Sequence, residues 1–463
     1  MSYINKKSSW LYILVAIMFV VVGVLAYALT LDRSAPKIIV QNEVMGKDIY
    51  WNLQNPIKID IGDASGIKSY EVTFNDGQSQ INLDTKVVKE DQNSVSLEIS
   101  SPKNSEFLKA TNGTLKIVAF DNSKWNFFKG NEAIKTTNVI IDRRSPIANV
   151  ITNSYLLRQG GSGVLIVEVA DDNLKDYYVT FNDEVIFELF PFYKKNYYIS
   201  IITWPIDIKE FKRVNLVAID MAGNKSVTKI PYYIQPFKEK VDELKISDEF
   251  ANNISKKVLE ESNMPVPLEP AEIFVKANKE LRQKNLQTMK EVVVQNFKNN
   301  EQIPFNVKPF VRLPNAATFA MFGERRHYFY GDQKIDEAWH LGMDWASVKR
   351  ADINITNPGK VIFKDYLGIY GNSIIVDHGL GLASLYAHTS SQNVEVGDFV
   401  TTGQHIANTG ATGAVFGDHL HFGILIQGIE ANPNEWLDVS WMNKNLDQTM
   451  KDAIKIIDGK NSK

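Results

Sequence analysis

The chain has 463 residues, of which 44% are hydrophobic and 23% are charged, and its formal net charge is −3. This composition is ordinary for folded protein, which argues against disorder, and the length predicts about three domains. A nearly neutral charge gives no electrostatic footprint for nucleic acid, and the absence of cysteine excludes disulfide frameworks, thiolate metal sites and cysteine nucleophiles.

The N-terminal segment is an uncharged apolar run over residues 10–31, preceded by Lys6 and Lys7. A helix of this length reaches the roughly 30 Å needed to cross a bilayer core. The lysines favour a cytoplasmic N-terminus and export of the rest. A cleaved signal peptide is the alternative, because residues 26–28 resemble a small-residue cleavage site. Since the run continues past that site, we predict a retained anchor over residues 1–32 in the cytoplasmic membrane.

The next 200 residues contain an internal repeat of short alternating stretches separated by glycine, asparagine, aspartate and proline, which is typical of β-structure. Three segments recur in the same order at a spacing of roughly 100 residues, the size of an immunoglobulin-type β-sandwich. They are 32–36 with 142–146, 67–76 with 174–183, and 115–121 with 215–220. We predict two β-sandwich modules, 33–141 and 142–236, which resemble the Ig-like modules that act as spacers or docking surfaces.

A helical connector is expected over residues 237–304. Ser247 is a candidate N-cap, and an apolar face follows at Phe250, Ile254 and Val258. Prolines break this helix, and a second begins at Pro270, the favoured first helical position. A coiled-coil partner site is one interpretation, but we favour a connector that packs on its own protein.

The chemistry is concentrated in the last third of the chain. All seven histidines lie after residue 326, in a β-rich and glycine-rich domain predicted over 305–440, which a C-terminal helix or tail follows over 441–463. His340 and Asp344 form one pair, and His419 and His421 form another whose spacing puts both imidazoles on one face of a strand. Two histidines, one aspartate and a water match a catalytic zinc site. From spacing alone, other divalent metals and an ordinary strand pair remain alternatives.

Beyond these pairs, the domain resembles the lysostaphin/LytM-type zinc endopeptidases of bacterial cell walls. The resemblance covers about 130 residues, roughly 310–440. Its motifs, in order, are Phe322-Gly323-Glu324-Arg325-Arg326, His340-Leu341-Gly342-Met343-Asp344, Tyr370-Gly371-Asn372, Tyr386-Ala387-His388, Val396-Gly397-Asp398, Thr402-Gly403-Gln404, Thr412-Gly413, His419-Leu420-His421-Phe422 and Asn432-Pro433.

The resemblance implies that His340, Asp344 and His421 hold Zn²⁺. It also implies that His388 and His419 flank the attacking water and the scissile peptide. One of these two imidazoles would take the proton from the water and deliver it to the leaving amine, and the other would stabilise the oxyanion. The sequence does not decide which does which.

Several residues near these motifs receive other interpretations. Asp418 stands where the family commonly has proline; it either bonds a histidine or faces solvent, and we favour solvent. We interpret His378 as structural, His405 as a solvated strand residue, and His327 as a candidate for the substrate groove. One arginine of the Arg325-Arg326 pair binds a substrate carboxylate or forms a structural salt bridge.

The sequence therefore predicts a mainly β multidomain protein with a transmembrane helix, two β-sandwich modules, a helical connector and a LytM-type peptidase domain outside the cytoplasmic membrane. Its expected function is zinc-dependent hydrolysis of peptide bonds in peptidoglycan, with a regulatory protein partner as a further candidate. The alternative is a non-catalytic or latent wall-binding member that activates another hydrolase. Blocking of the groove by the N-terminal modules stays open.

Overall fold

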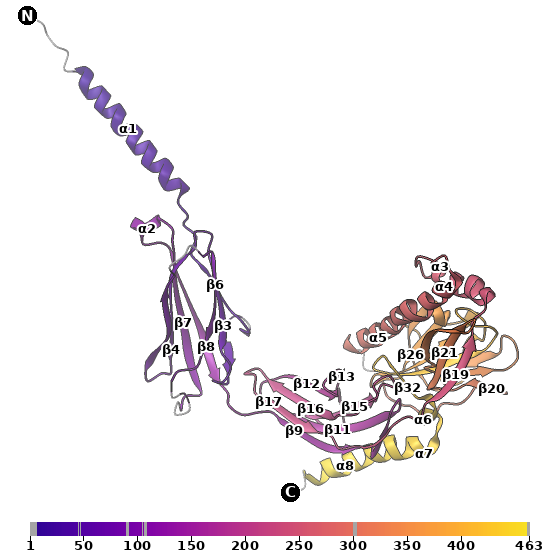
Figure 1. Cartoon of the computed structure of the whole chain (residues 1–463). Coiled ribbons are helices and arrows are strands. Elements are labelled where there is room, and N and C mark those ends of the chain that lie inside the picture. Colours follow the sequence, from indigo (N-terminus) through magenta and orange to yellow (C-terminus); the bar gives the residue numbers. More distant parts are fainter. Residues whose placement is uncertain are drawn as a thin grey trace, which may run out of the picture. The chain divides into compact units, whose positions relative to one another are not determined.

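The chain is described by a computed structural model over residues 7–44, 46, 48–88, 92–103, 105, 109–299 and 303–460 (Figure 1). It is mostly β-structure, which confirms the predicted fold class. Two compact units are present: Met1–Pro146 with Asp171–Lys175 and Ile219–Lys225, and Ile147–Ala170 with Asp176–Ala218 and Ser226–Lys463.

The first element, helix α1 (Lys7–Thr30), is the predicted apolar segment. Its window Trp10–Tyr27 has a mean hydropathy of 2.5, and none of it is buried against other parts of the described chain. By length and composition the helix is able to cross a membrane.

Two sheets form the first module. They bury alternate residues of their strands in a common core that includes Trp51, Ile59 and Phe74. The burial of β3 alternates strictly along its length, as expected for a strand with one face on the core. One sheet has the order β1 (Lys37–Val40), β3 (Ile57–Gly62) and β6 (Ser94–Ile99); the other has the order β2 (Asp48–Trp51), β8 (Glu132–Ile141), β7 (Asn112–Asp121), β4 (Ile67–Asn75) and β5 (Gln80–Val87).

The second module is also built from two sheets, and the sequence repeat has a structural counterpart. Carboxylate oxygens of Asp32, Asp63 and Asp121 lie within 4.8 Å of one another, as do those of Asp142, Asp171 and Asp220. Membership of the immunoglobulin class stays a prediction. One sheet has the order β14 (Phe190–Pro191), β15 (Tyr197–Thr203), β11 (Ser162–Ala170) and β9 (Ile147–Asn153); the other has the order β13 (Val185–Phe187), β12 (Leu174–Phe181), β16 (Val214–Asp220) and β17 (Lys225–Lys229).

The segment predicted as a helical connector begins differently. After β18 (Tyr233–Gln235), residues Lys240–Lys245 form strand β19, which pairs in parallel with β21 (Glu324–Tyr330). Pairing with a strand about 80 residues later in the chain supplies backbone hydrogen bonds that local propensity does not reveal.

Helices follow β19, as expected. Ser247 Oγ accepts a hydrogen bond from Phe250 N at 3.1 Å, and Pro270 is at the start of its helix, so both predicted start signals are confirmed. The helices share a core with Ile375, Leu385 and Leu425 of the C-terminal domain, which supports packing on their own protein. They are η2 (Phe250–Ser255), α3 (Lys256–Glu261), α4 (Pro270–Lys276), η3 (Ala277–Leu281) and α5 (Arg282–Lys298).

The C-terminal domain is organised around an eight-stranded sheet. Its path is β20 (Ala317–Ala320), β23 (Met343–Ala346), β31 (Leu420–Ile426), β27 (Leu382–Ala387), β26 (Asn372–Asp377), β25 (Gly359–Tyr366) and β29 (Phe399–Val400), with β32 (Ile429–Ala431) paired to β31. Strand β22 (Gln333–Trp339) extends the β19–β21 pair, and β24 (Asp352–Asn354), β30 (His405–Asn408) and β28 (Ser391–Gln392) form a further sheet.

The chain ends in helices that pack against the second module. Trp436 Nε1 donates a hydrogen bond to Ser162 Oγ at 3.0 Å, and Lys194 forms an ion pair with Asp458 at 2.6 Å. The helices are α6 (Pro433–Leu437), α7 (Val439–Met442), η5 (Asn443–Asp447) and α8 (Gln448–Lys460).

Candidate metal centre

Three neighbouring strands bring the predicted site residues together. In the antiparallel ladders, Asp344 on β23 lies directly opposite His421 on β31, and Ala387 at the end of β27 lies opposite His421 on its other side. His388 follows Ala387, and His419 precedes β31 by one residue. Because side chains alternate along a strand, His419 and His421 face the same way.

Three potential ligand groups converge within hydrogen-bonding distance. Asp344 Oδ1 lies 2.8 Å from His421 Nδ1, Asp344 Oδ2 lies 3.1 Å from His340 Nε2, and the two imidazole nitrogens are 3.2 Å apart. His340 and His421 are buried, and Asp344 is half-buried. Two imidazoles and a carboxylate with their ligand atoms turned to one point are a donor set that suits a zinc ion.

Backbone carbonyl groups fix the orientation of three imidazoles. Nδ1 of His340 lies 2.9 Å from the carbonyl oxygen of Met321, and Nδ1 of His388 lies 2.9 Å from that of Thr412. His419 makes the same contact with Gly417 at 2.9 Å. A neutral imidazole that donates its Nδ1–H to a carbonyl leaves Nε2 free to accept a proton or bind a metal.

Close approach of glycine backbone to the site fixes the positions of His421 and His388. A Cβ atom at Gly342 would lie 2.4 Å from His421 Nε2, so only glycine leaves room for that ring. Gly371, with a φ of 62°, brings its backbone against Thr412, where a Cβ would lie 2.4 Å from the carbonyl oxygen. Since that oxygen also holds His388, the conformational freedom of Gly371 positions the imidazole.

Burial and mutual charge set the protonation of the centre. Burial alone would raise the pKa of Asp344, but His340 and His421 outweigh it and hold that pKa well below its usual value. Burial lowers the pKa of His421 to about 4, and it also holds the pKa of His388 well below its usual value, with the nearby imidazoles adding to the effect. An ionised Asp344 carboxylate beside a neutral His421 imidazole is the state that binds a metal cation.

The site opens into a groove of about 840 Å³ whose walls come from two parts of the sequence. Strand β19 and the helices after it line one wall through residues that include Phe250, Phe274 and Arg282. The rings of Phe250 and Phe416 lie 4.3 Å apart between centroids, which joins the helical segment to the loop before His419. Sequence reasoning missed this wall, since an apolar helix face gives no sign of the groove that it borders.

The other singled-out residues have local roles. Arg325 pairs with Glu337 and lies over Trp339, whereas Arg326 lines the groove and lies 3.6 Å from both Glu324 and Asp344. Both arginines therefore form ion pairs within the protein.

The remaining histidines and Asp418 lie outside the centre. His378 is buried and contacts Pro358 O and Ser384 Oγ at 2.7 Å each, as a structural residue does, and His405 lies on β30 beside Asp352 at 3.6 Å. His327 Nε2 lies 3.4 Å from Glu337 and does not line the groove. Asp418 accepts hydrogen bonds from Arg350 N and Thr409 Oγ1, so it neither bonds a histidine nor simply faces solvent.

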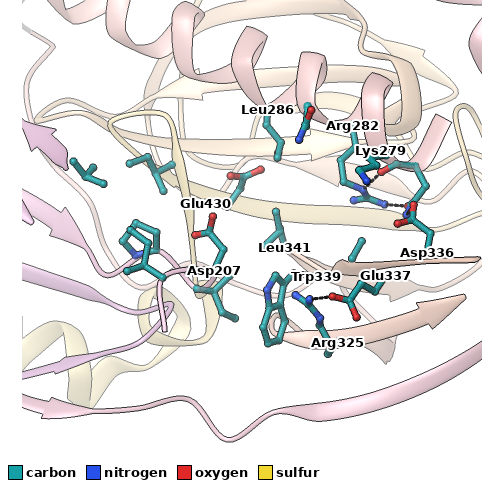
Figure 2. Close-up of a pocket in the computed structure, with 18 residues that line it drawn as sticks. Asp207, Lys279, Arg282, Leu286, Arg325, Asp336, Glu337, Trp339, Leu341 and Glu430 are labelled. Carbon is teal, nitrogen blue, oxygen red and sulfur yellow. Dashed lines mark hydrogen bonds and ion pairs between the residues drawn. The ribbon is translucent and has the colours of Figure 1, made fainter. Parts of the chain in front are cut away.

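A second cavity of about 580 Å³ adjoins the groove and shares Asn278, Arg282 and Leu341 with it (Figure 2). Figure 2 shows the Glu430 and Asp207 carboxylates turned toward one another beside Leu341. Burial raises the pKa of Glu430 to about 7, and repulsion from Asp207 contributes. None of the residues that line this cavity is a histidine, so the candidate chemistry lies in the groove.

Comparison with known proteins identifies the domain that carries this centre. Residues 338–433 match the model of Peptidase family M23. The chain therefore carries an M23 domain in its C-terminal third, which confirms the resemblance noted from the motifs.

Curated relatives match the chain over about a quarter of its length. Murein hydrolase activator EnvC of Escherichia coli is 37% identical over 108 residues, which are 23% of this chain and 26% of that protein. Peptidoglycan DD-endopeptidase ShyB of Vibrio cholerae is 36% identical over 129 residues, 28% of this chain and 29% of that protein. DD-carboxypeptidase/endopeptidase Mpg of Neisseria meningitidis is 32% identical over 129 residues, 28% of each protein. The chain thus spans about a quarter of the length of these relatives.

Among solved structures, the catalytic domain of lysostaphin from Staphylococcus simulans is similar at 26% identity and a TM-score of 0.23, covering 27% of this chain and 94% of that one.

Proposed function

We propose that the protein is a zinc-dependent peptidoglycan endopeptidase that α1 holds in the cytoplasmic membrane, with the remaining chain on the outer side. The observation that carries the proposal is the convergence of His340, Asp344 and His421 on one point, with His388 and His419 beside them in an open groove. The M23 match and the relatives named as peptidoglycan endopeptidases support this substrate class.

In this proposal, His340 Nε2, an Asp344 carboxylate oxygen and His421 Nδ1 hold zinc. A bound zinc ion supplies Lewis acidity, which activates water and polarises a carbonyl group. His388 and His419 lie with ring centroids 4.9 Å apart, and each is fixed through Nδ1, so each presents Nε2 to the groove. One accepts the proton of the water and passes it to the leaving amine, and the other stabilises the oxyanion through a hydrogen bond.

The substrate's peptide would lie along the groove between the helical wall and the C-terminal sheet. Exposed apolar side chains, including Phe319 and Phe416, line it, and Arg326 adds a cation near the centre. Such a mixed lining suits an extended peptide with carboxylate groups.

The second candidate is an activator of another wall hydrolase, and the similarity to EnvC favours it. The two functions differ in their need for the metal centre, because an activator acts by contact with its partner rather than by hydrolysis. A regulatory protein partner is compatible with both.

The deciding experiment digests purified peptidoglycan with the detergent-solubilised full chain and reads the products by mass spectrometry. Wild type is compared with His421→Ala and with the matched control His405→Ala, which removes a histidine from a surface strand. We expect wild type and His405→Ala to bind one zinc and cleave crosslinked fragments, and His421→Ala to do neither. Absence of cleavage by zinc-loaded wild type, together with stimulation of an added wall hydrolase by all three forms, would establish the activator instead.

A further inference from the structure

The loop between β7 and β8 carries two phenylalanine side chains that contact little of the protein. Phe127 is 93% exposed and Phe128 is 70% exposed. Single exposed apolar residues are normal on soluble surfaces, but adjacent aromatic side chains at the end of a loop form a continuous apolar patch of the kind that marks a contact site. Residues 124–129, which we call the tip, include helical turn α2 (Trp125–Phe128).

The backbone of the tip is held in a conformation that side-chain-bearing residues rarely adopt. Asn126, Phe127 and Phe128 have φ values of 52°, 56° and 66°, all in the left-handed region. Lys68 Nζ donates hydrogen bonds to the carbonyl oxygens of Phe128 and Lys129 at 3.1 and 3.3 Å. Such strain persists where surrounding contacts impose it, and it is common at functional positions. The tip is therefore a constrained turn that keeps both rings exposed.

Asp32 ties the base of the tip to the end of α1. Its carbonyl oxygen accepts hydrogen bonds from Ser123 Oγ at 2.6 Å and from Asn131 Nδ2 at 3.2 Å, the residues that flank the tip. Arg33 lies over the Trp125 ring at 4.2 Å. Since Asp32 follows the last residue of α1 by two positions, these contacts hold the base of the tip within about 10 Å of that helix end. Figure 1 shows α2 at the end of the first module where the chain enters it.

The charges around the tip favour a lipid surface. Lys124 and Lys129 flank the phenylalanines and are exposed. Three acidic side chains, Asp32, Asp63 and Asp121, lie at the base of the tip, are half-buried or buried, and accept hydrogen bonds from within the module. Glu132 is exposed, but it lies outside the tip at the start of β8. The outer face of the tip thus combines aromatic rings with cations, the pairing that suits the boundary between lipid headgroups and acyl chains.

We propose that the tip docks on the bilayer beside α1, with Phe127 and Phe128 in the interfacial layer and Lys124 and Lys129 at lipid phosphates. The headgroup layer of each leaflet is roughly 5–7 Å thick, which is within reach of side chains held this close to the helix end. The inference rests on the proposed membrane anchor. A spanning helix together with an interfacial loop restricts how far the first module tilts about its short link to the membrane.

The test uses the full chain in vesicles of phosphatidylethanolamine and phosphatidylglycerol. Because the protein has no cysteine, a single introduced cysteine carries one fluorophore without background. Lys129→Cys reports on the tip and keeps both phenylalanines. Gln78→Cys is the matched control, since it is exposed on the β4–β5 turn at the opposite end of the same sheet. Lipids with a spin label near the headgroup quench a fluorophore that lies in the interface.

We expect at least a threefold stronger quenching at Lys129→Cys than at Gln78→Cys. Adding Phe127→Ser and Phe128→Ser should reduce it to the control level, whereas Phe127→Trp and Phe128→Trp should preserve it. Alkaline carbonate washing reports the anchor separately, and every variant should stay with the vesicles.

Two outcomes would overturn the inference in distinguishable ways. Retention through the wash with equal quenching at both positions would refute the docked tip and leave the anchor standing. Release of the wild-type chain by the wash would refute the anchor and, with it, the tip. Cleavage of peptidoglycan by the solubilised protein does not depend on either result, so the peptidase assignment is tested apart from both.

Discussion

The two repeated modules put similar sequence to different structural use. In the first module, β3 alternates between buried and exposed side chains, and its sequence alternates with it. In the second, β11 has seven buried positions among nine, and residues 163–167 are a continuous apolar run. A strand covered on both faces needs no polar face. The comparison teaches that the sequence pattern of one strand already indicates whether one face or both faces of that strand are covered.

The second face of β11 is covered by the C-terminal end of the same chain. Glu435 accepts a hydrogen bond from Ser162 N at 2.6 Å, and Trp436 bonds the side chain of the same serine. Gln427, which follows β31, accepts a hydrogen bond from Glu188 N at 2.7 Å. Because β31 carries His421, the fused module is part of the framework that holds the candidate centre.

Removing a buried tryptophan from the first module, or from the C-terminal helices that pack on the second, should give the largest contrast. Trp436 is fully buried and Trp51 is 2% exposed, so each alanine substitution should lower the free energy of unfolding of its own unit by about 3–5 kcal/mol. Trp436→Ala should also reduce zinc binding and peptidoglycan cleavage near the melting temperature, and Trp51→Ala should not. Thermal unfolding and cleavage assays on the same samples measure both effects. Equal loss of cleavage in the two variants would show that the stability of the first module and that of the candidate centre are coupled.

Replacing one glycine by alanine in each region tests the same contrast with the addition of a single methyl group. A Cβ at Gly342 would lie 2.4 Å from His421 Nε2, and a Cβ at Gly113 in the first module would lie 2.4 Å from the Phe74 ring. Gly342→Ala should weaken zinc affinity by about 10–100-fold, because it displaces a ligand. Gly113→Ala should cost about 1–3 kcal/mol of stability and leave zinc affinity unchanged. Zinc titration by calorimetry separates the two outcomes, and unchanged affinity in Gly342→Ala would argue against His421 as a ligand.

These contrasts also show how far the sequence predicts the molecule. The i, i+2 spacing of His419 and His421 predicted that both rings face the same way. The register of β23 against β31, which sets His421 opposite Asp344, does not follow from that spacing. Strand β19 was missed, since residues 240–245 show no alternation and their partner β21 is distant in the chain. The helical wall of the groove, which includes Phe250, was missed for a related reason. Local periodicity shows which face of a helix is apolar, but not which other part of the chain that face packs against.

The stability of the two regions should respond to pH with opposite sign: a buried glutamate in the C-terminal helices disfavours high pH, and a half-buried one in the first module disfavours low pH. Burial raises the pKa of Glu435 to about 7, so its protonated form is favoured on folding, and the stability that this contributes is present below pH 4.5 and lost as the pH rises through about 7. In the first module, Glu43 is partly desolvated, but Lys135 and Thr137 outweigh this and lower its pKa, so that contribution is lost as the pH falls. Between pH 5 and pH 8, the effect of Glu435 should lower the free energy of unfolding of the second unit by about 1–2 kcal/mol. Glu435→Gln should remove most of that decrease. An unchanged slope in chemical denaturation would show that Glu435 is ionised in the folded protein.

The smallest effects should come from ion pairs on the two surfaces. Lys194 and Asp458 tie α8 to the second module with side chains 41% and 47% exposed, and Lys58 and Glu98 pair across β3 and β6 with side chains 54% and 68% exposed. Solvent and salt screen such pairs, so Asp458→Asn and Glu98→Gln should each change the free energy of unfolding only slightly, and less at high salt than at low salt. Denaturant melts at low and high salt measure this directly. A larger loss in Asp458→Asn alone would mean that α8 docks mainly through this pair rather than through its buried Ala453 and Ile457. The contact between the second module and the C-terminal domain would then be weaker than the buried strand implies.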